Sequence, residues 1–201
     1  GLKERLERNT KTLTERIIPE EELPDTTGQE IFRFESFGDL NNEIQLENYL
    51  NIARKNPNTR FTLWTKMYEL AYKYFADHPD VPENFTLILS SLMINLKLDI
   101  SRFKELKGGT VFKKGQLKVF TVYDKEYIDK HFEELDLNCG SRYCNGCRKC
   151  YSKNEIEEIN EILKSDQDAV GVMEGLRDPV KREEFTKYLE DFFKTNDKGG
   201  K

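Results

Sequence analysis

The feature that most limits the fold of this chain is a regular alternation of strand-like and helix-like segments. Four short segments, each apolar or alternating between apolar and polar residues, predict strands at 31–37, 60–65, 85–90 and 117–123. The segments between them carry apolar residues at helical spacing. Strands that alternate with helices in this way are joined by right-handed crossovers and lie parallel. We therefore expect an α/β fold with a parallel sheet and alternating helices, arranged as an open sheet or part of a barrel.

The remaining segments frame this core. Apolar spacing predicts a charged N-terminal helix and a C-terminal helical extension, with one helix around Ile156, Ile159 and Ile162 and another over 185–193. The expected division of the chain is an N-terminal helical segment, an α/β core, a four-cysteine metal-binding loop, and C-terminal helices with a frayed tail. The bounds of these four parts are 1–26, 27–136, 137–153 and 154–201.

All four cysteines of the chain lie in one short segment, with the spacing Cys-x4-Cys-x2-Cys-x2-Cys. They are Cys139, Cys144, Cys147 and Cys150. Thiolates this close in sequence favour one shared metal ion or iron–sulfur cluster. Two disulfides are disfavoured, because a chain with 34% charged residues and no recognisable secretory signal does not resemble a secreted disulfide scaffold. The segment is therefore expected to form a cysteine-rich metal lobe.

Zinc is the expected metal, since four sulfurs form a closed tetrahedral site of the structural kind. A [4Fe–4S] cluster is the alternative. The first three spacings match the opening of plant-type ferredoxins, but the fourth ligand is distant there and follows after two residues here. Either group bound by four thiolates leaves a net charge of about −2. The basic side chains expected to offset this charge are Arg142, Arg148, Lys149 and Lys153.

Polar side chains follow the predicted strands. In parallel sheets, ligands bind at the carboxyl ends of the strands, so these positions form a candidate ligand site. The residues expected there are Ser36, Asp39, Thr65, Lys66, Ser90 and Ser91, followed by Tyr123 and Asp124 after the fourth strand. Such a set suits a phosphate, a sugar or an amino-acid-like ligand, and the candidates for catalysis are Asp39, Lys66, Ser90 and Ser91. The same residue types also cap helices and form turns, which is the structural alternative.

Composition excludes several classes of protein. The net charge of −5 and the pI near 5.3 argue against broad attraction to nucleic acid or anionic lipid. No apolar run is long enough to span a membrane, so a membrane partner is not expected. Phosphate-loop, dinucleotide-binding and zinc-protease motifs are absent from the sequence. We therefore expect a cytoplasmic protein.

Five segments occur in an order that is similar to a known family. They are SFGD at 36–39, IARKNPNTRF at 52–61, WTK at 64–66, LSS at 89–91 and the cysteine cluster. Together they resemble the phage Gene product 88 domain family over 31–151. The resemblance implies a phage or mobile-element origin, hence a host-cell cytoplasm, and implies no activity. Two features depart from the family: Phe37 interrupts the Ser-Gly-Asp segment, and the further upstream cysteine-bearing segment of family members is absent, so a piece of the functional unit is expected to be missing.

Three interpretations of function follow. The first is a metal-stabilised binding or interaction module with a structural four-cysteine site and a ligand site at the strand ends. The second is an iron–sulfur enzyme with a redox or radical-generating cluster beside the strand ends. The third is a nucleic-acid-processing enzyme or adaptor, in which basic side chains of the metal lobe contact phosphates. The expected partner is accordingly a protein or a nucleic acid. The sequence does not decide whether the chain is an enzyme.

Overall fold

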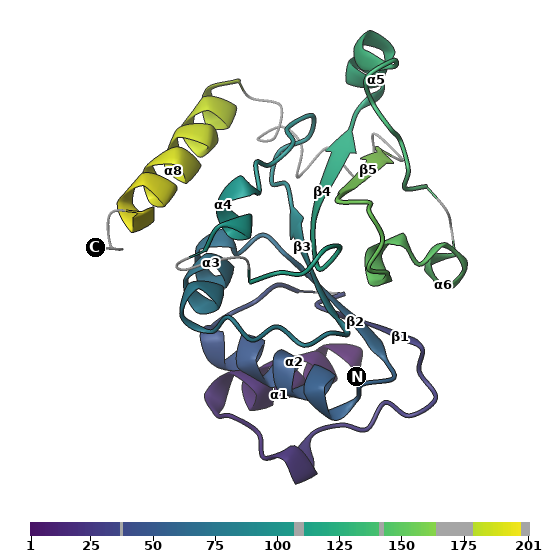
Figure 1. The fold of residues 1–201 in the computed structure, drawn as a ribbon, viewed down its shortest axis with the longest axis vertical. Coiled ribbons are helices and arrows are strands. Elements are labelled where there is room, and N and C mark those ends of the chain that lie inside the picture. The colour runs from purple at the N-terminus through teal and green to yellow at the C-terminus, as the bar shows by residue number, and fades with distance from the viewer. Residues whose placement is uncertain (37, 107–110, 141–142, 164–178, 198–201) are drawn as a thin grey trace.

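A computed structural model describes residues 1–36, 38–106, 111–140, 143–163 and 179–197. Its centre is a parallel sheet whose five strands are ordered β1-β2-β3-β4-β5, as they are in the sequence (Figure 1). The strands are β1 Ile31–Phe34, β2 Arg60–Thr65, β3 Phe85–Ser90, β4 Leu117–Tyr123 and β5 Glu158–Ile162. The expected α/β fold with a parallel sheet is confirmed.

Helical segments connect and flank the strands. They are α1 Leu2–Glu15, η1 Glu20–Glu22, α2 Glu43–Lys55, α3 Tyr68–Asp77, α4 Ser101–Lys104, α5 Lys125–His131, α6 Cys144–Cys147, η2 Lys149–Tyr151 and α8 Pro179–Asp197. The main crossover helices have recognisable ends. The side chain of Asn42 caps α2 by accepting a hydrogen bond from the backbone N–H of Gln45 (2.9 Å), and Asn56 ends that helix before Pro57. Within the described residues, no helix combines the length and apolar character needed to cross a membrane.

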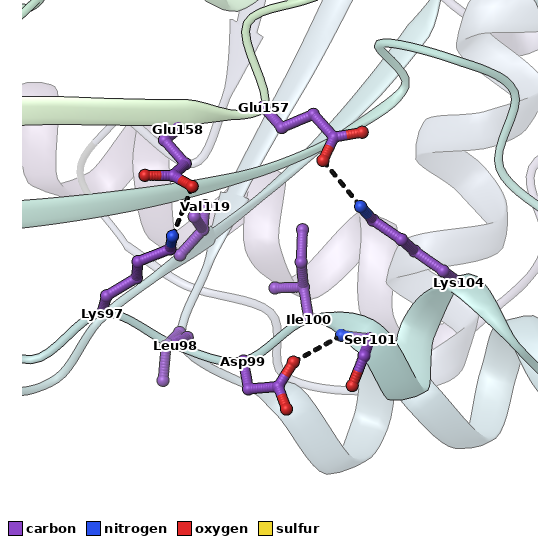
Figure 2. Close-up of a pocket in the computed structure, with 9 residues that line it drawn as sticks. All are labelled: Lys97, Leu98, Asp99, Ile100, Ser101, Lys104, Val119, Glu157 and Glu158. Atoms are coloured by element: carbon purple, nitrogen blue, oxygen red, sulfur yellow. Dashed lines mark hydrogen bonds and ion pairs between the residues drawn. The ribbon is translucent and has the colours of Figure 1, made fainter. Parts of the chain in front are cut away.

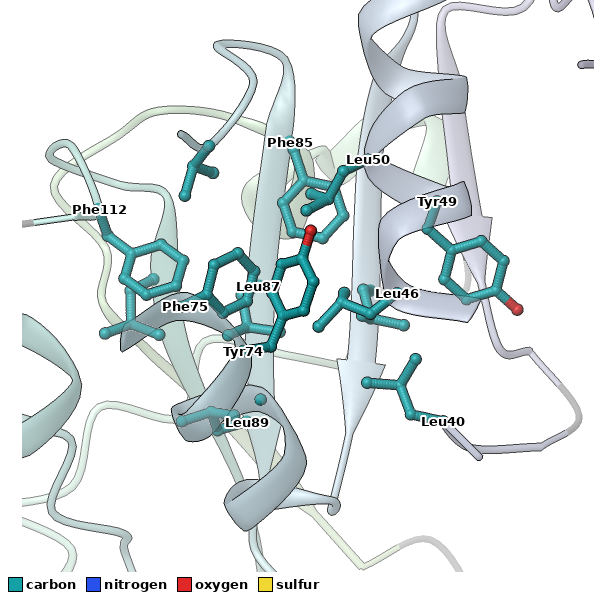
Figure 3. Packing of buried hydrophobic residues seen from close by; sticks show 14 of the residues in the cluster. Leu40, Leu46, Tyr49, Leu50, Tyr74, Phe75, Phe85, Leu87, Leu89 and Phe112 are labelled. Carbon is teal, nitrogen blue, oxygen red and sulfur yellow. The ribbon is translucent and has the colours of Figure 1, made fainter. Parts of the chain in front are cut away.

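The hydrophobic core lies on the sheet face covered by α2 and α3. Alternate residues of the central strands point to this face, where Phe61, Leu63, Phe85 and Leu87 are fully buried. Figure 3 shows the side chains of α2 and α3 packing against them, including Leu46, Leu50 and Phe75. The connections from β1 to β4 place α2, α3 and α4 on this one face, as successive right-handed crossovers do, whereas the connection from β4 to β5 contains η2 and crosses the opposite face.

The C-terminal helix α8 lies on the same side of the sheet as α3 and α4 (Figure 1). Its aromatic side chains form edge contacts with the ring of Tyr72, with centroid distances of 5.6 Å to Phe192 and 5.3 Å to Phe193. The guanidinium of Arg182 donates hydrogen bonds to the carbonyls of Ile94 (2.8 Å) and Asn95 (3.0 Å). Helix α8 is therefore part of the helical layer.

The opposite face of the sheet carries the other half of each strand's side chains, including Thr62, Ile88 and Lys118. No long helix covers this face among the described residues. Instead, η2 packs on β2 and β3, and the segment that contains α6 lies on this side (Figure 1). The cysteine segment is thus separated from the helical layer by the full thickness of the sheet.

Two expectations about elements are wrong. The segment around Ile156, Ile159 and Ile162 is not a helix, because β5 forms there and pairs with β4 from Val119↔Glu158 to Tyr123↔Ile162. Isoleucine is β-branched and fits a strand well, so pairing with the open edge of β4 prevails over a weak helical spacing. Strand β1 also ends at Phe34 instead of continuing to 37, since Glu35 takes a left-handed backbone conformation with a φ of 53°.

Candidate functional site

The strand-end residues Asp39, Thr65 and Lys66 meet, as the parallel topology predicts. One carboxylate oxygen of Asp39 accepts hydrogen bonds from the Thr65 hydroxyl (2.5 Å) and from the N–H of Leu40 (2.8 Å). The other accepts from the backbone N–H of Lys66 (2.9 Å). This Asp39 clamp joins the end of β2 to the loop after β1. Asp39 therefore has a structural role, whereas the side chain of Lys66 extends from an exposed position.

The remaining strand-end candidates are mostly turn and cap residues. The Ser91 hydroxyl donates to the carbonyl of Met93 (2.8 Å) and accepts from the N–H of the same residue (3.2 Å), which closes a turn. Ser90 is buried, and its carbonyl accepts a hydrogen bond from the hydroxyl of Tyr68. Asp124 caps α5, and Ser36 is exposed and takes no part in the Asp39 clamp. Ser91 and Asp124 therefore serve as turn and helix-cap residues, which is the structural alternative to a ligand-binding role.

We expect Asp39→Ala to lower the free energy of unfolding by about 2 kcal/mol without changing the fold, because three donors lose their acceptor. Lys66→Ala is the matched control, and its exposed side chain predicts a change within about 0.5 kcal/mol. Urea unfolding followed by circular dichroism measures both. Equal midpoints for Asp39→Ala and the parent would show that the clamp contributes nothing to stability and leave the carboxylate free for another task.

A hydrogen-bonded network around Glu35, beside the clamp, was not predicted. Glu35 accepts hydrogen bonds from the Tyr49 hydroxyl and, at 2.6 Å, from the amide of Gln45, which also donates to Tyr49 (2.8 Å). Burial raises the pKa of Glu35, the bond from Tyr49 opposes that shift, and the charge of Asp39 adds to it. The sequence pattern predicts a longer strand that includes Glu35. It therefore gives no indication that the chain turns after Phe34 and directs Glu35 inward.

The raised pKa of Glu35 predicts a pH-dependent stability. The carboxyl group ionises at lower pH in the unfolded chain than in the folded one, so its favourable contribution is complete below the unfolded pKa and is lost as pH rises through the folded pKa. We expect Glu35→Gln to be more stable than the parent by about 1 kcal/mol at pH 8, a figure discounted for partial exposure, and to lose this advantage near pH 4. Chemical denaturation at both pH values tests this. Glu43→Gln, at an exposed carboxylate, should show no such trend; an advantage of Glu35→Gln that stays constant with pH would contradict the prediction.

A cavity of about 390 Å³ lies beside β4 and β5 on the helical side. Figure 2 shows that its charged side chains are paired: Lys97 with Glu158, and Lys104 with Glu157 at 2.6 Å. The backbone N–H of Ser101 likewise donates to Asp99 (2.9 Å). These contacts brace β5 against the segment around α4. With its lysines already matched by carboxylates, this cavity offers a ligand little unpaired charge.

The four cysteines are distributed over three local structures. Cys139 lies at the outer edge of β5, where its N–H donates to the carbonyl of Asn160 (2.9 Å) and it forms a bridge with Glu161. Cys144 and Cys147 begin and end α6, and Cys150 lies in η2. Cys144 is exposed, and the other three cysteines are partly buried.

Cys150 lies within electrostatic range of the other three cysteines. Its pKa is raised to about 12, chiefly by burial and also by the charges of Cys139, Cys144 and Cys147, while Lys118 acts to lower it. Within the described ranges, no three His, Cys, Asp or Glu side chains are arranged to hold a metal ion. The soft donors therefore share one region of the sheet's non-helical face without forming a closed coordination site.

The basic side chains expected to offset the charge of this site have other partners. Arg148 pairs with Glu30, Lys149 donates to the carbonyl of Asn138 (2.7 Å), and Lys153 pairs with Glu83. Arg142 lies outside the described residues. The three described side chains tether the cysteine segment to the body of the protein. The nucleic-acid interpretation required these same side chains for phosphate contacts, but in the structure they bind protein groups.

A cation of the sheet that acts on Cys150 is Lys118, which sequence reasoning missed. It is fully buried in β4, and its ammonium donates to the side-chain oxygen of Asn154 (2.7 Å) and the carbonyl of Ile156 (2.6 Å). Burial lowers the pKa of Lys118 to about 8, and the charges of Cys150 and Glu157 oppose that shift. A lysine at an inward position of an otherwise apolar strand was the signal that could have revealed it.

The cysteine segment lacks a hydrophobic core of its own. Among the described residues from 132 to 158, none is buried. Hydrogen bonds to the sheet edge and exposed ion pairs hold this stretch, and exposed ion pairs contribute little stability. A segment of this kind commonly depends on a metal or a crosslink for its stability.

Comparisons with known proteins give one match. The model of the family described as Gene product 88 matches residues 2–153. That range contains β1 to β4 and all four cysteines, and it ends before β5. The comparisons with curated proteins and with solved structures found no match.

Proposed function

The chain belongs to the phage Gene product 88 family, and from the arrangement of its cysteines we propose that it is a metal-binding α/β protein whose four-cysteine site is structural. In this proposal the site organises a binding module, and the ligand edge of that module lies at the carboxyl ends of the strands. The family match carries no activity, so the proposal rests on the residues themselves.

One observation carries the metal proposal: four cysteines, of which Cys150 lies within electrostatic range of the other three, fall in a segment without a buried residue among those described. Structural zinc sites in small motifs supply apparent binding free energies on the order of 10 kcal/mol, and this energy is available for folding. Cys139, Cys144, Cys147 and Cys150 would hold the ion, linking the edge of β5 to α6 and η2. Apart from the hydrogen bonds of Lys118 to Asn154 and Ile156, this stretch is otherwise held by contacts of low individual strength.

Zinc is preferred because four sulfur donors suit a tetrahedral ion that needs no further ligand. The fully buried ammonium of Lys118 lies close enough to Cys150 to favour negative charge on the sulfurs. When bound, zinc would supply a crosslink and no reaction step. A redox or radical role for a [4Fe–4S] cluster remains the competing proposal for the same donors.

Metal analysis of anaerobically purified protein tests the proposal. We expect colourless protein with about one zinc per chain, as four-thiolate structural sites bind. Brown protein with broad absorption at about 400 nm would replace zinc by an iron–sulfur cluster. Metal-free protein whose four reduced thiols take up no added zinc would overturn metal binding altogether. Adding zinc back is necessary because metal loss during purification would otherwise resemble absence of a site.

A further inference from the structure

A groove with a volume of about 640 Å³ lies at the carboxyl edge of the sheet. Its walls are the beginnings of α2 and α3, the residues that follow β3, and α8. The volume falls within the range of about 300–1,000 Å³ that is usual for small-molecule sites. The groove is therefore large enough for a small organic ligand, and it lies at the edge where ligands of parallel sheets bind.

The apolar part of the groove combines side chains from three separate elements. Met67 is 42% exposed, Leu92 is 36% exposed and Tyr188 is 47% exposed. Large apolar side chains that are exposed singly need no explanation, but several around one depression indicate a binding surface. They present a surface on which an aliphatic or aromatic group would be desolvated.

Judged from the described residues alone, the charged part of the groove has one uncommitted cation. The ammonium of Lys73 pairs with Glu69 at 3.4 Å, and Glu69 also accepts from the hydroxyl of Tyr188. Lys66 lines the same groove, and in the part of the chain that the structure describes its side chain forms no ion pair. Glu43, at the first turn of α2, is the groove's exposed carboxylate and has no ion pair within those same residues.

From these features we propose that the groove binds a small amphipathic monoanion, with its carboxylate on Lys66 and its apolar part on Met67, Leu92 and Tyr188. Glu43 disfavours ligands with additional negative charge, which is why a monoanion fits better than a phosphorylated compound. This inference rests on the strand-end ligand edge of the proposed function and is independent of its metal site.

The test uses the full chain in its zinc-loaded form. The fluorescent amphipathic anion 8-anilinonaphthalene-1-sulfonate is the first probe, and octanoate, octanol and octylammonium compete with it. We expect octanoate to displace the dye at a concentration about tenfold lower than octanol does, with octylammonium weakest. Lys66→Met should weaken octanoate about fivefold, and Glu43→Gln should strengthen it, since a surface charge pair changes binding by this order. Lys97→Met, at an exposed lysine outside the groove, should change nothing.

Equal displacement by octanoate and octanol, or an unchanged octanoate affinity in Lys66→Met, would overturn the inference and show apolar adsorption alone. Failure to bind the dye would do so as well. Zinc content measured on the same samples separates the two proposals. Protein that retains zinc but shows no charge-selective binding contradicts the groove proposal alone, whereas selective binding by protein that takes up no added zinc contradicts the metal proposal alone.

Discussion

Cys147→Ser is expected to release the metal and to lower the free energy of unfolding by about 3 kcal/mol or more, the largest effect predicted for any single substitution here. Cys147 ends α6 and lies between Cys144 and Cys150, so its sulfur connects the exposed part of the segment to the part packed on β2 and β3. Once the ion is released, no bond crosslinks the three remaining sulfurs. The segment has no buried residue among those described with which to hold its shape.

Zinc content, thermal unfolding and amide hydrogen exchange together measure this effect. Exchange should increase first in 138–160, because that stretch and β5 depend on the site, while α2 and α3 keep their protection. Ser152→Ala is the matched control, since it lies two residues beyond the last cysteine and offers no sulfur. Full retention of zinc and of the unfolding temperature in both Cys144→Ser and Cys147→Ser would refute a shared structural site.

The sequence predicted the parts of the fold that depend on local pattern. The strands at Arg60–Thr65, Phe85–Ser90 and Leu117–Tyr123 match their expected bounds, because each is a run of residues suited to a covered sheet. Strand β5 was missed because Ile156, Ile159 and Ile162 recur every third residue, which is compatible with a helix. Its strand conformation comes from pairing with β4, a contact between residues distant in sequence that spacing alone does not reveal.

The candidate site was likewise predictable from the sequence only in part. Topology predicted that Asp39, Thr65 and Lys66 would meet, since strand ends of a parallel sheet share one edge. It did not predict that Asp39 would be occupied by three internal donors, because hydrogen-bond partners depend on loop conformation. The inward turn of Glu35 follows from a positive φ that its residue type does not favour. Lys118 is buried because the cysteine segment covers it. Its burial could be predicted only by knowing where that segment packs.

Lys118→Ala is expected to lower the free energy of unfolding by about 3 kcal/mol, the second of the two largest effects. The substitution removes the two hydrogen bonds that join β4 to the irregular stretch before β5, at the Asn154 side chain and the Ile156 carbonyl. It also leaves a cavity where the buried four-carbon stem now packs between the sheet and the cysteine segment. Lys118→Met fills most of that cavity without restoring the hydrogen bonds, so it should recover about half of the loss.

Equilibrium unfolding in urea compares these variants with Lys97→Ala as the matched control. Lys97 also joins the sheet's last strand to a neighbouring element, through its ion pair with Glu158, but its side chain is 51% exposed. An exposed pair of this kind is worth about 0–1 kcal/mol, so the control should differ little from the parent. If Lys118→Ala were no more destabilising than Lys97→Ala, the buried ammonium would not be anchoring the cysteine segment. A loss in Lys118→Met equal to that in Lys118→Ala would instead assign the whole effect to the hydrogen bonds and none to packing.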